Sequence, residues 1–250
     1  MKRRSCALSL AAMLLLTPLT GCVTPTDLFQ DAPSGTSSTT PSDTLTGAGR
    51  SLDEQSLTAA LPAPEDLDPA WHSDNVGEQT REGTVDTFKP QRCGRVASTG
   101  PEWDEIDSSE RAEAEAAFER TPDAGSTSAD SLALSITSYD EPYPSRLMDL
   151  KAEALTDCRN FKVRAENGEW LPYELHNLAF PTLGDSTVAL RMSIRAQVSS
   201  GELVITMDVV TVKVGHNVIS TTQISMGGIP DTSVSETAIR TTLAGLEGQP

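Results

Sequence analysis

The chain has 250 residues, a formal net charge of -17 at pH 7 and only 4% aromatic residues. Such an acidic chain repels nucleic acid and anionic lipid headgroups, so we expect its surface to bind neither. Its length is sufficient for one domain of about 200 residues, and the scarcity of aromatic residues predicts a core built mainly from Leu, Val, Ile and Ala.

The N-terminus has the form of a bacterial lipoprotein leader. Three cations within the first four residues precede an apolar run over residues 7–19, which closes as Leu-Thr-Gly-Cys at residues 19–22. Because this run is too short for a permanent membrane span, we interpret residues 1–21 as a cleaved lipoprotein signal peptide. Losing it takes the formal charge from -17 to -20.

Cys22 is the predicted lipidation site. In lipoproteins of this type the thiol receives a diacylglyceryl group, and the cysteine becomes the first residue of the mature chain. Two acyl chains of roughly 15 methylenes each, at ~0.8 kcal/mol per methylene, would hold the protein at the membrane almost permanently. The alternative is an ordinary secretory leader in which Cys22 occurs by chance.

Two cysteines remain for the folded part, because Cys6 leaves with the leader and Cys22 is lipidated. An exported chain meets an oxidising environment, so we predict a disulfide between Cys93 and Cys158. Closing a loop of that size stabilises the fold by roughly 4 kcal/mol in the chain-entropy model. The alternative, a two-cysteine metal site, lacks a C-x-x-C pair and a histidine at zinc spacing, and we expect no metal and no cofactor.

Residues 22–50 are rich in Ser, Thr, Pro and Gly and contain very few apolar residues. They cannot bury enough surface to offset the entropy of ordering, so we predict a disordered tether from the lipidated cysteine. A tether of ~28 residues, at about 5–6 Å times the square root of its length, places the domain roughly 30 Å from the bilayer. The folded domain is expected to occupy residues 51–250.

The first half of this domain shows few regular patterns. Ser51-Leu-Asp-Glu54 reads as a capping box that opens a helix, which Pro62 stops. Residues 62–83 read as an irregular crossing with Trp71 as an anchor. Residues 111–120 alternate as a strand does although Ala and Glu favour helix, and we choose strand; residues 132–139 read as its hairpin partner.

The second half is more regular. Residues 145–161 form a predicted helix whose apolar stripe directs Cys158 inward, toward Cys93. Five strand-like stretches separated by turn formers then predict an antiparallel meander, over residues 162–165, 169–178, 186–198, 202–214 and 218–224. A second capping box, Ser233-Val-Ser-Glu236, opens a terminal helix with Ile239, Leu243 and Leu246 on one face.

Several motifs resemble those of PknH-like extracellular sensor domains of actinobacterial lipoproteins, a family that includes the ectodomain of the kinase PknH. They are Ser138-Tyr-Asp140, the helix ending at Cys158, Gly184-Asp-Ser186, the Val214–Val218 hairpin and the capped terminal helix. The resemblance implies an α+β fold: a twisted antiparallel sheet of about five to seven strands, packed by two to three helices with one disulfide. It also implies a cleft for an unidentified ligand.

The chain departs from the kinase ectodomain in two respects. It has no kinase portion, and its two remaining cysteines allow one disulfide where that ectodomain carries two. Any signalling output would therefore pass through a partner, and the identity of a ligand does not transfer.

Signals for catalysis are weak. Gly184-Asp185-Ser186 is similar to an esterase nucleophile motif, but Thr187 follows it and no histidine has the expected C-terminal setting, so we interpret it as a turn. The histidines His72, His176 and His216 form no metal-binding pair. A carboxylate cluster lacks the order of a calcium loop and is interpreted as a solvated face; it comprises Glu102, Asp104, Glu105, Asp107 and Glu110.

Two hypotheses remain, and neither involves catalysis. The first is a ligand-binding or sensor-like module, lipid-anchored on the extracytoplasmic face of the cell membrane, with an apolar-lined cleft beside the sheet. The second is a protein-interaction module that scaffolds a cell-envelope complex. The expected partners are the membrane, through the lipid anchor, and a small molecule or an envelope protein; nucleic acid is excluded.

Overall fold

The computed structural model describes residues 47–74, 87–122, 129–165, 168–198 and 201–249. All of them belong to one compact unit, Asp43–Pro250. The predicted signal peptide, Cys22 and most of the predicted tether lie outside the described residues. The first element of the described residues is the 3-10 helix η1 (Gly47–Gly49), a few residues before the predicted domain start. No helix in the described ranges is long and apolar enough to cross a membrane.

Within these residues, nine antiparallel strands form one sheet in the order β1-β3-β4-β9-β8-β7-β6-β5-β2. The strands are β1 (Trp71–Asp74), β2 (Phe88–Lys89), β3 (Glu110–Arg120), β4 (Ala129–Tyr139), β5 (Asn160–Arg164), β6 (Trp170–Asn177), β7 (Ser186–Val198), β8 (Gly201–Val214) and β9 (Asn217–Met226). The helices are α1 (Glu54–Ala60), η2 (Pro64–Asp66), η4 (Gln91–Ala97), α2 (Pro101–Asp107), α3 (Ser145–Asp157) and α4 (Thr232–Glu247).

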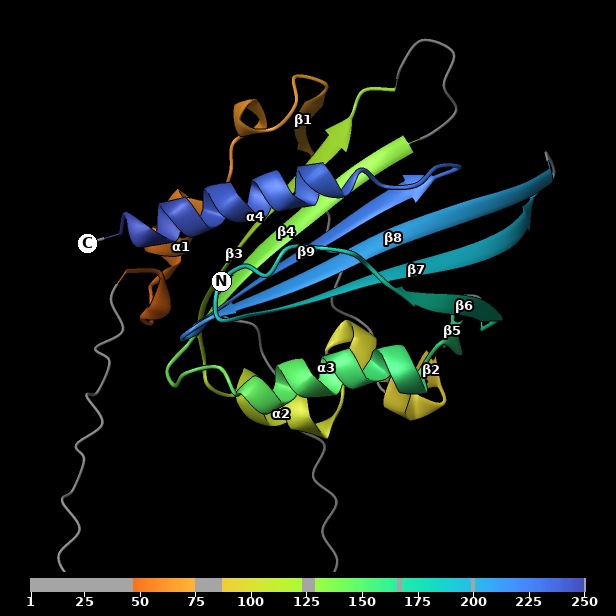
Figure 1. Ribbon diagram of the computed structural model, residues 1–250, viewed down its shortest axis with the longest axis horizontal. Helices are drawn as coiled ribbons and strands as arrows, with labels where there is room; N and C mark the ends of the chain where they lie inside the picture. The colour runs from red at the N-terminus through yellow and green to blue at the C-terminus, as the bar shows by residue number, and fades with distance from the viewer. Residues whose placement is uncertain (1–46, 75–86, 123–128, 166–167, 199–200, 250) are drawn as a thin grey trace, which may run out of the picture. The chain divides into compact units, whose positions relative to one another are not determined.

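The helices lie on both faces of the sheet, with α1 and α4 on one side and α2 and α3 on the other (Figure 1). Strand β8 shows this directly. Val210 and Val212 belong to the core under α1 and α4, while Thr211 between them accepts a hydrogen bond from Lys151 of α3. Since successive side chains of a strand point to opposite faces, the sheet is buried on both sides here.

The α1–α4 core contains mostly aliphatic side chains from the centre of the sheet. Its fully buried members include Leu57, Leu132, Ile136 and Ile239. A Cβ on Gly245 of α4 would lie 2.8 Å from the Cα of Ala60, so glycine permits the close approach of these two helices.

The second core lies under α3 and contains the predicted disulfide. Cys93 in η4 and Cys158 at the C-terminal end of α3 are joined, with their Cα atoms 5.6 Å apart. Trp103 of α2 and Tyr143 pack in the same cluster, and the indole Nε1 donates to the Tyr143 hydroxyl at 3.2 Å. The α+β class and the Cys93–Cys158 disulfide are therefore confirmed.

The predicted count of five to seven strands is wrong. The edge strands β1 and β2 have four and two residues, too few to show an alternating pattern in the sequence. The described residues also form four α-helices where two to three were predicted. The additional helix is α2, whose acidic residues were interpreted only as a solvated face. Its seven residues contain one buried side chain, Trp103, so they show no apolar periodicity in the sequence.

Three helix boundaries also differ from prediction. Helix α3 ends at Asp157, and Phe161 instead lies on β5, where its ring stacks 5.3 Å from that of Tyr173. Both capping boxes were placed wrongly, because an aspartate caps each helix: Asp53 accepts from Ser56 N and Asp231 from Ser233 N. Asp is as good an N-cap as Ser, so the spacing motif alone could not choose between them.

Lys151 is an unusual member of the second core because it is a buried cation. It is 4% exposed, and its Nζ donates to Ser98 Oγ at 2.8 Å and to Thr211 Oγ1 at 2.7 Å. Both acceptors are neutral hydroxyls. Burial therefore lowers the pKa of Lys151 to about 8 from its ordinary value of 10.5.

This shift predicts a pH-dependent stability. Between pH 8 and 9.5 the unfolded chain holds a proton on Lys151 that the folded chain releases, so the free energy of unfolding should rise by about 1–2 kcal/mol. Lys151→Met should abolish the rise. Urea denaturation at half-unit pH steps measures it; a rise that persists in the variant would assign it to another group. Tyr143 and Tyr173 do not produce it, because their raised pKa values lower stability above pH 10.

Candidate functional site

A pocket of about 260 Å³ lies where the start of α4 approaches the β1 side of the sheet. Its size falls just below the ~300–1,000 Å³ typical of small-molecule sites. The lining residues come from the chain after η2, from β1, β3, β4 and β9, from the β9–α4 loop and from α4. They are Leu67, Asp68, Trp71, Arg120, Asp130, Gln223, Ile229, Asp231, Ser233, Val234 and Thr237.

The lining is more polar than the predicted apolar cleft, with seven polar residues among eleven. Arg120, at the end of β3, lies 3.5 Å from Asp130 at the start of β4. Asp231 caps α4, and Asp68 accepts a hydrogen bond from Ala70 N at 2.9 Å. Hydrogen bonding and charge therefore dominate the chemistry of this pocket.

Gln223 contributes a buried amide to the pocket. It is 1% exposed, and its Oε1 accepts from Ser235 Oγ at 2.9 Å. Its Nε2 has no hydrogen-bond partner in the part of the chain that the structure describes. A buried amide with an unused donor at a pocket wall is positioned to bind an acceptor atom.

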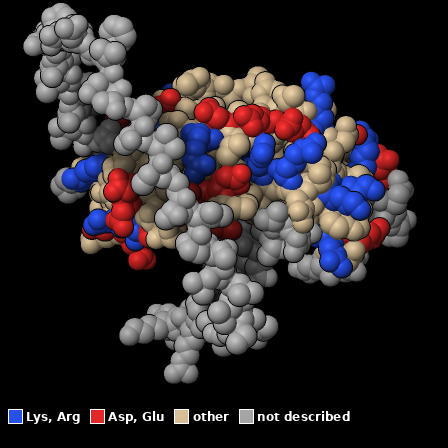
Figure 2. Space-filling model, turned by 90° about the horizontal axis from the view of Figure 1, so that it is seen from below, with Lys and Arg blue, Asp and Glu red and all other residues tan. Residues whose placement is uncertain are grey.

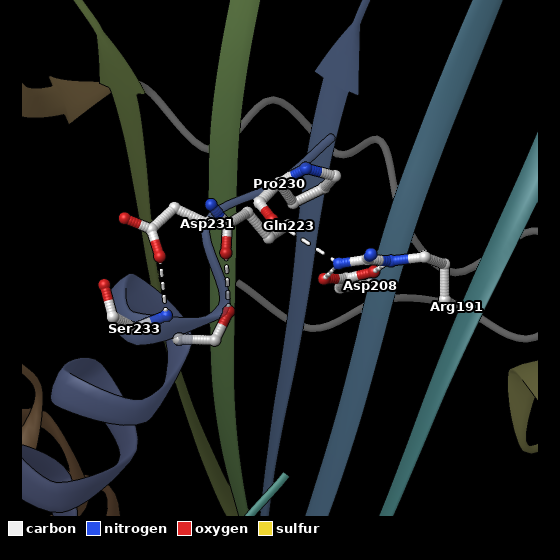
Figure 3. Close-up of polar contacts among 7 residues, drawn as sticks. Arg191, Asp208, Gln223, Pro230, Asp231 and Ser233 are labelled. Carbon is white, nitrogen blue, oxygen red and sulfur yellow. Dashed lines mark hydrogen bonds and ion pairs between the residues drawn. The ribbon is translucent and has the colours of Figure 1, made fainter. Parts of the chain in front are cut away.

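Beside the pocket, a buried ion pair holds the β9–α4 loop (Figure 3). Asp208 on β8 is fully buried, and the Arg191 guanidinium on β7 donates to both of its carboxylate oxygens at 2.6 Å. The same guanidinium lies 3.4 Å from the carbonyl oxygen of Pro230 in the loop. The hydrogen bond to Asp208 also raises the pKa of Arg191, so its charge is permanent.

The register of the sheet places the ion pair next to the pocket. Asp208 is paired across the sheet with Gln223, and both side chains lie on the face covered by α4. Pro230 is flanked by Ile229 and Asp231, two residues of the pocket rim. Arg191 thus positions the loop that closes one side of the pocket.

The sequence motif Gly184-Asp185-Ser186 forms a turn, as interpreted. Gly184 has a φ of 59°, and Asp185 Oδ2 accepts a hydrogen bond from Gly215 N at 2.7 Å. Ser186 Oγ is buried without a hydrogen-bond partner, so no general base activates it.

The predicted histidines and carboxylates form no common site. His72 and His176 are exposed, and His216 Nδ1 lies 3.0 Å from the carbonyl oxygen of Tyr139. The acidic residues of α2 face solvent, where Glu105 pairs with Arg146 at 3.3 Å. Among the described residues, no group of three His, Cys, Asp or Glu side chains is placed to hold a metal ion.

Three residues of the family-like motifs fasten the start of the domain. Ser138 Oγ accepts from Leu52 N at 2.8 Å, and Asn217 Nδ2 donates to the carbonyl oxygens of Ala48 and Arg50. Gly215 lies so close to Gly49 that a Cβ would clash with the backbone there. These three residues therefore support the fold, whereas the capped terminal helix, another of the motifs that carry the resemblance, contributes Ser233 and Val234 to the pocket.

The surface carries charges of both signs. Figure 2, which views the domain from the side on which α3 lies, shows acidic and basic side chains interspersed over the visible face. Salt bridges on α3 contribute to this mixture, among them Arg95–Glu153 at 3.3 Å. This face therefore presents no single-signed patch of the kind that binds nucleic acid.

These features define an α+β sheet domain with a small polar pocket beside α4. No family model and no curated protein matches the chain. Its structure is similar to the extracellular domain of PknH from Mycobacterium tuberculosis, with a TM-score of 0.56 at 7% identity, covering 80% of this chain and 100% of that domain. At this identity the similarity shows the fold alone, and at that level it confirms the PknH-like resemblance.

Two further structures match less well. One is the Rv0999 ortholog from Mycobacterium smegmatis, with a TM-score of 0.43 at 10% identity, covering 77% of this chain and 97% of that one. The other is LpqN of Mycobacterium tuberculosis, described as involved in cell envelope biogenesis, with a TM-score of 0.27 at 12% identity, covering 76% and 79%. Neither contributes to the conclusions below.

The ion pair predicts a specific pattern of stabilities. Arg191→Met leaves the buried Asp208 carboxylate uncompensated and should cost about 3–5 kcal/mol. The double variant Arg191→Met/Asp208→Leu removes both charges and should recover most of this loss. Urea denaturation of the parent and both variants measures the difference. If the double variant is as unstable as the single one, lost packing and not an unpaired charge is the cause.

Proposed function

We propose that this protein is a lipid-anchored, extracytoplasmic ligand-binding or sensor-like module of the cell envelope. The observation that carries the proposal is the pocket beside α4, with the unused Gln223 amide donor in its wall. The fold shared with an extracellular domain supports the location. The leader and the cysteine at residue 22 supply the proposed anchor.

The pocket supports binding rather than catalysis. Its lining contains no histidine, cysteine or lysine, and each of its three carboxylates already has a protein partner: Ala70 N for Asp68, Arg120 for Asp130 and Ser233 N for Asp231. Its one arginine is paired with Asp130. A site of this kind holds a molecule by hydrogen bonds and charge, and occupancy can act on the β9–α4 loop that Arg191 holds.

Native mass spectrometry of the full chain, extracted from the producing cell's membranes, tests binding. We expect an added mass that disappears on denaturation. Thr237→Trp should abolish it, because Thr237 lines the pocket and is exposed, so a larger side chain fills the space without disturbing the core. Arg240→Trp, at an exposed position of the same helix outside the pocket, is the matched control and should keep the added mass.

Other results would reject this function. If the parent and both variants show only the mass of the chain itself, and another protein is stably co-extracted with them, the result would favour the interaction module that scaffolds an envelope complex. An added mass that survives Thr237→Trp would move the binding site elsewhere.

Membrane fractionation tests the anchor separately. Cys22→Ser removes the proposed acylation site, and the chain should then no longer depend on acyl chains for attachment. We expect the variant to leave the membrane fraction on washing with high salt and carbonate, while the parent stays. Retention of the variant through both washes would mean that another feature anchors the protein.

A further inference from the structure

We propose that the pocket beside α4 takes a small organic cation, an ammonium-bearing molecule that also carries a hydrogen-bond acceptor. The proposal rests on the ligand-binding function proposed above and names the chemical class of the ligand. Three features of the lining determine this class: its charge, its buried donor and its size.

The charge of the lining is negative. Three carboxylates face the pocket, those of Asp68, Asp130 and Asp231, against one guanidinium, that of Arg120. Arg120 lies 3.5 Å from Asp130, so this pair is compensated and two carboxylates remain. An anionic ligand would have to compete with Asp130 for the arginine and would be repelled by the other two, whereas a cation is attracted.

The two remaining carboxylates belong to exposed residues, and each has one oxygen bound to a backbone amide. Asp231 uses Oδ1 to cap α4 through Ser233 N at 3.0 Å, and Asp68 uses Oδ1 to accept from Ala70 N at 2.9 Å. In each case one oxygen is held by the backbone, and the other oxygen has no protein partner in the described ranges. Each carboxylate therefore keeps an oxygen that can accept from an ammonium group, which offers three donors.

Gln223 supplies the second requirement. The residue is almost completely buried, its Oε1 is bound by Ser235, and its Nε2 is unused among the described residues. This donor belongs to a residue of the pocket lining, where an oxygen of a ligand can accept from it. The ligand should therefore carry an acceptor, such as a hydroxyl, carbonyl or ether oxygen, some distance from its ammonium group.

The apolar walls limit the size of the ligand body. Leu67, Trp71 and Val234 line the pocket, and Ile229, which is 72% exposed, stands at its rim. The volume of about 260 Å³ corresponds to about nine waters at ~30 Å³ each. This is room for a skeleton on the order of ten non-hydrogen atoms, as in a small amino alcohol or an amino sugar.

Three nitroxide probes of the same ring skeleton test the class: 4-amino-, 4-hydroxy- and 4-carboxy-TEMPO, which are cationic, neutral and anionic at pH 7. Each is added to the full chain carrying Cys22→Ser, and paramagnetic broadening is measured at the backbone amides of Gln223, Ser233 and Thr237. We expect the amino probe to broaden them most, by up to about fivefold over the hydroxy probe, and the carboxy probe least.

A matched pair of variants separates the pocket from the general acidity of the chain. Asp231→Asn removes one pocket carboxylate but keeps the N-cap, since Asn caps helices as well as Asp. Asp53→Asn is the same change at the cap of α1, outside the pocket. The preference for the amino probe should fall in Asp231→Asn and remain unchanged in Asp53→Asn.

Each other outcome overturns the proposal in a distinguishable way. If the neutral or anionic probe broadens the pocket amides most, or if both variants reduce the preference equally, the pocket is not selective for cations although the proposed binding function stands. If no probe broadens the pocket amides more than other exposed amides, the cation class fails. A bare chain in native mass spectrometry would then remove the binding function as well.

Discussion

A single sheet has two faces, and a different part of the chain must remove each of them from water. Here α1 and α4, from the two ends of the domain, cover one face, and α3, from its middle, covers the other. Helix α1 has only seven residues, and helices this short are marginal alone, so it depends on the sheet and on α4. The disulfide adds a covalent link within the α3 layer, between the end of α3 and η4.

The pocket lies where one of these layers ends. On the face under α4, each central strand changes from apolar to polar along its length: β4 from Ile136 to Asp130, β8 from Val212 to Asp208, and β9 from Ile219 to Gln223. Beyond the start of α4 no helix of the described residues packs on these strands, so apolar side chains are not required there. Buried polar groups in this region must instead satisfy one another, and Arg191 with Asp208 does so, which leaves Gln223 with a donor to spare.

The regular half of the fold was predictable and the site was not. Strand β7 was predicted to the residue and β8 within one, because long alternating strands between turn formers give a strong local signal. Arg120 and Asp130 lie near the turn of one hairpin, but Gln223 and Asp231 follow more than 90 residues later and share no spacing motif with them, so only the strand order brings the two pairs together. A weak signal existed in Asp130, Asp208 and Gln223, which interrupt apolar alternation on the inward-facing side of their strands.

The motifs that carry the family resemblance explain why the resemblance extends to the fold and not to the ligand. Ser138, Asp185 and Asn217 all use their side chains on backbone groups, fastening η1 and two turns to the sheet. Backbone groups are the same in every sequence, so such contacts can be kept while other side chains change. The pocket residues face an open volume, and the backbone contacts of Asp68 and Asp231 there use only one oxygen of each carboxylate. Structures sharing this fold can therefore hold pockets of different charge, and the ligand of each must be inferred from its own lining.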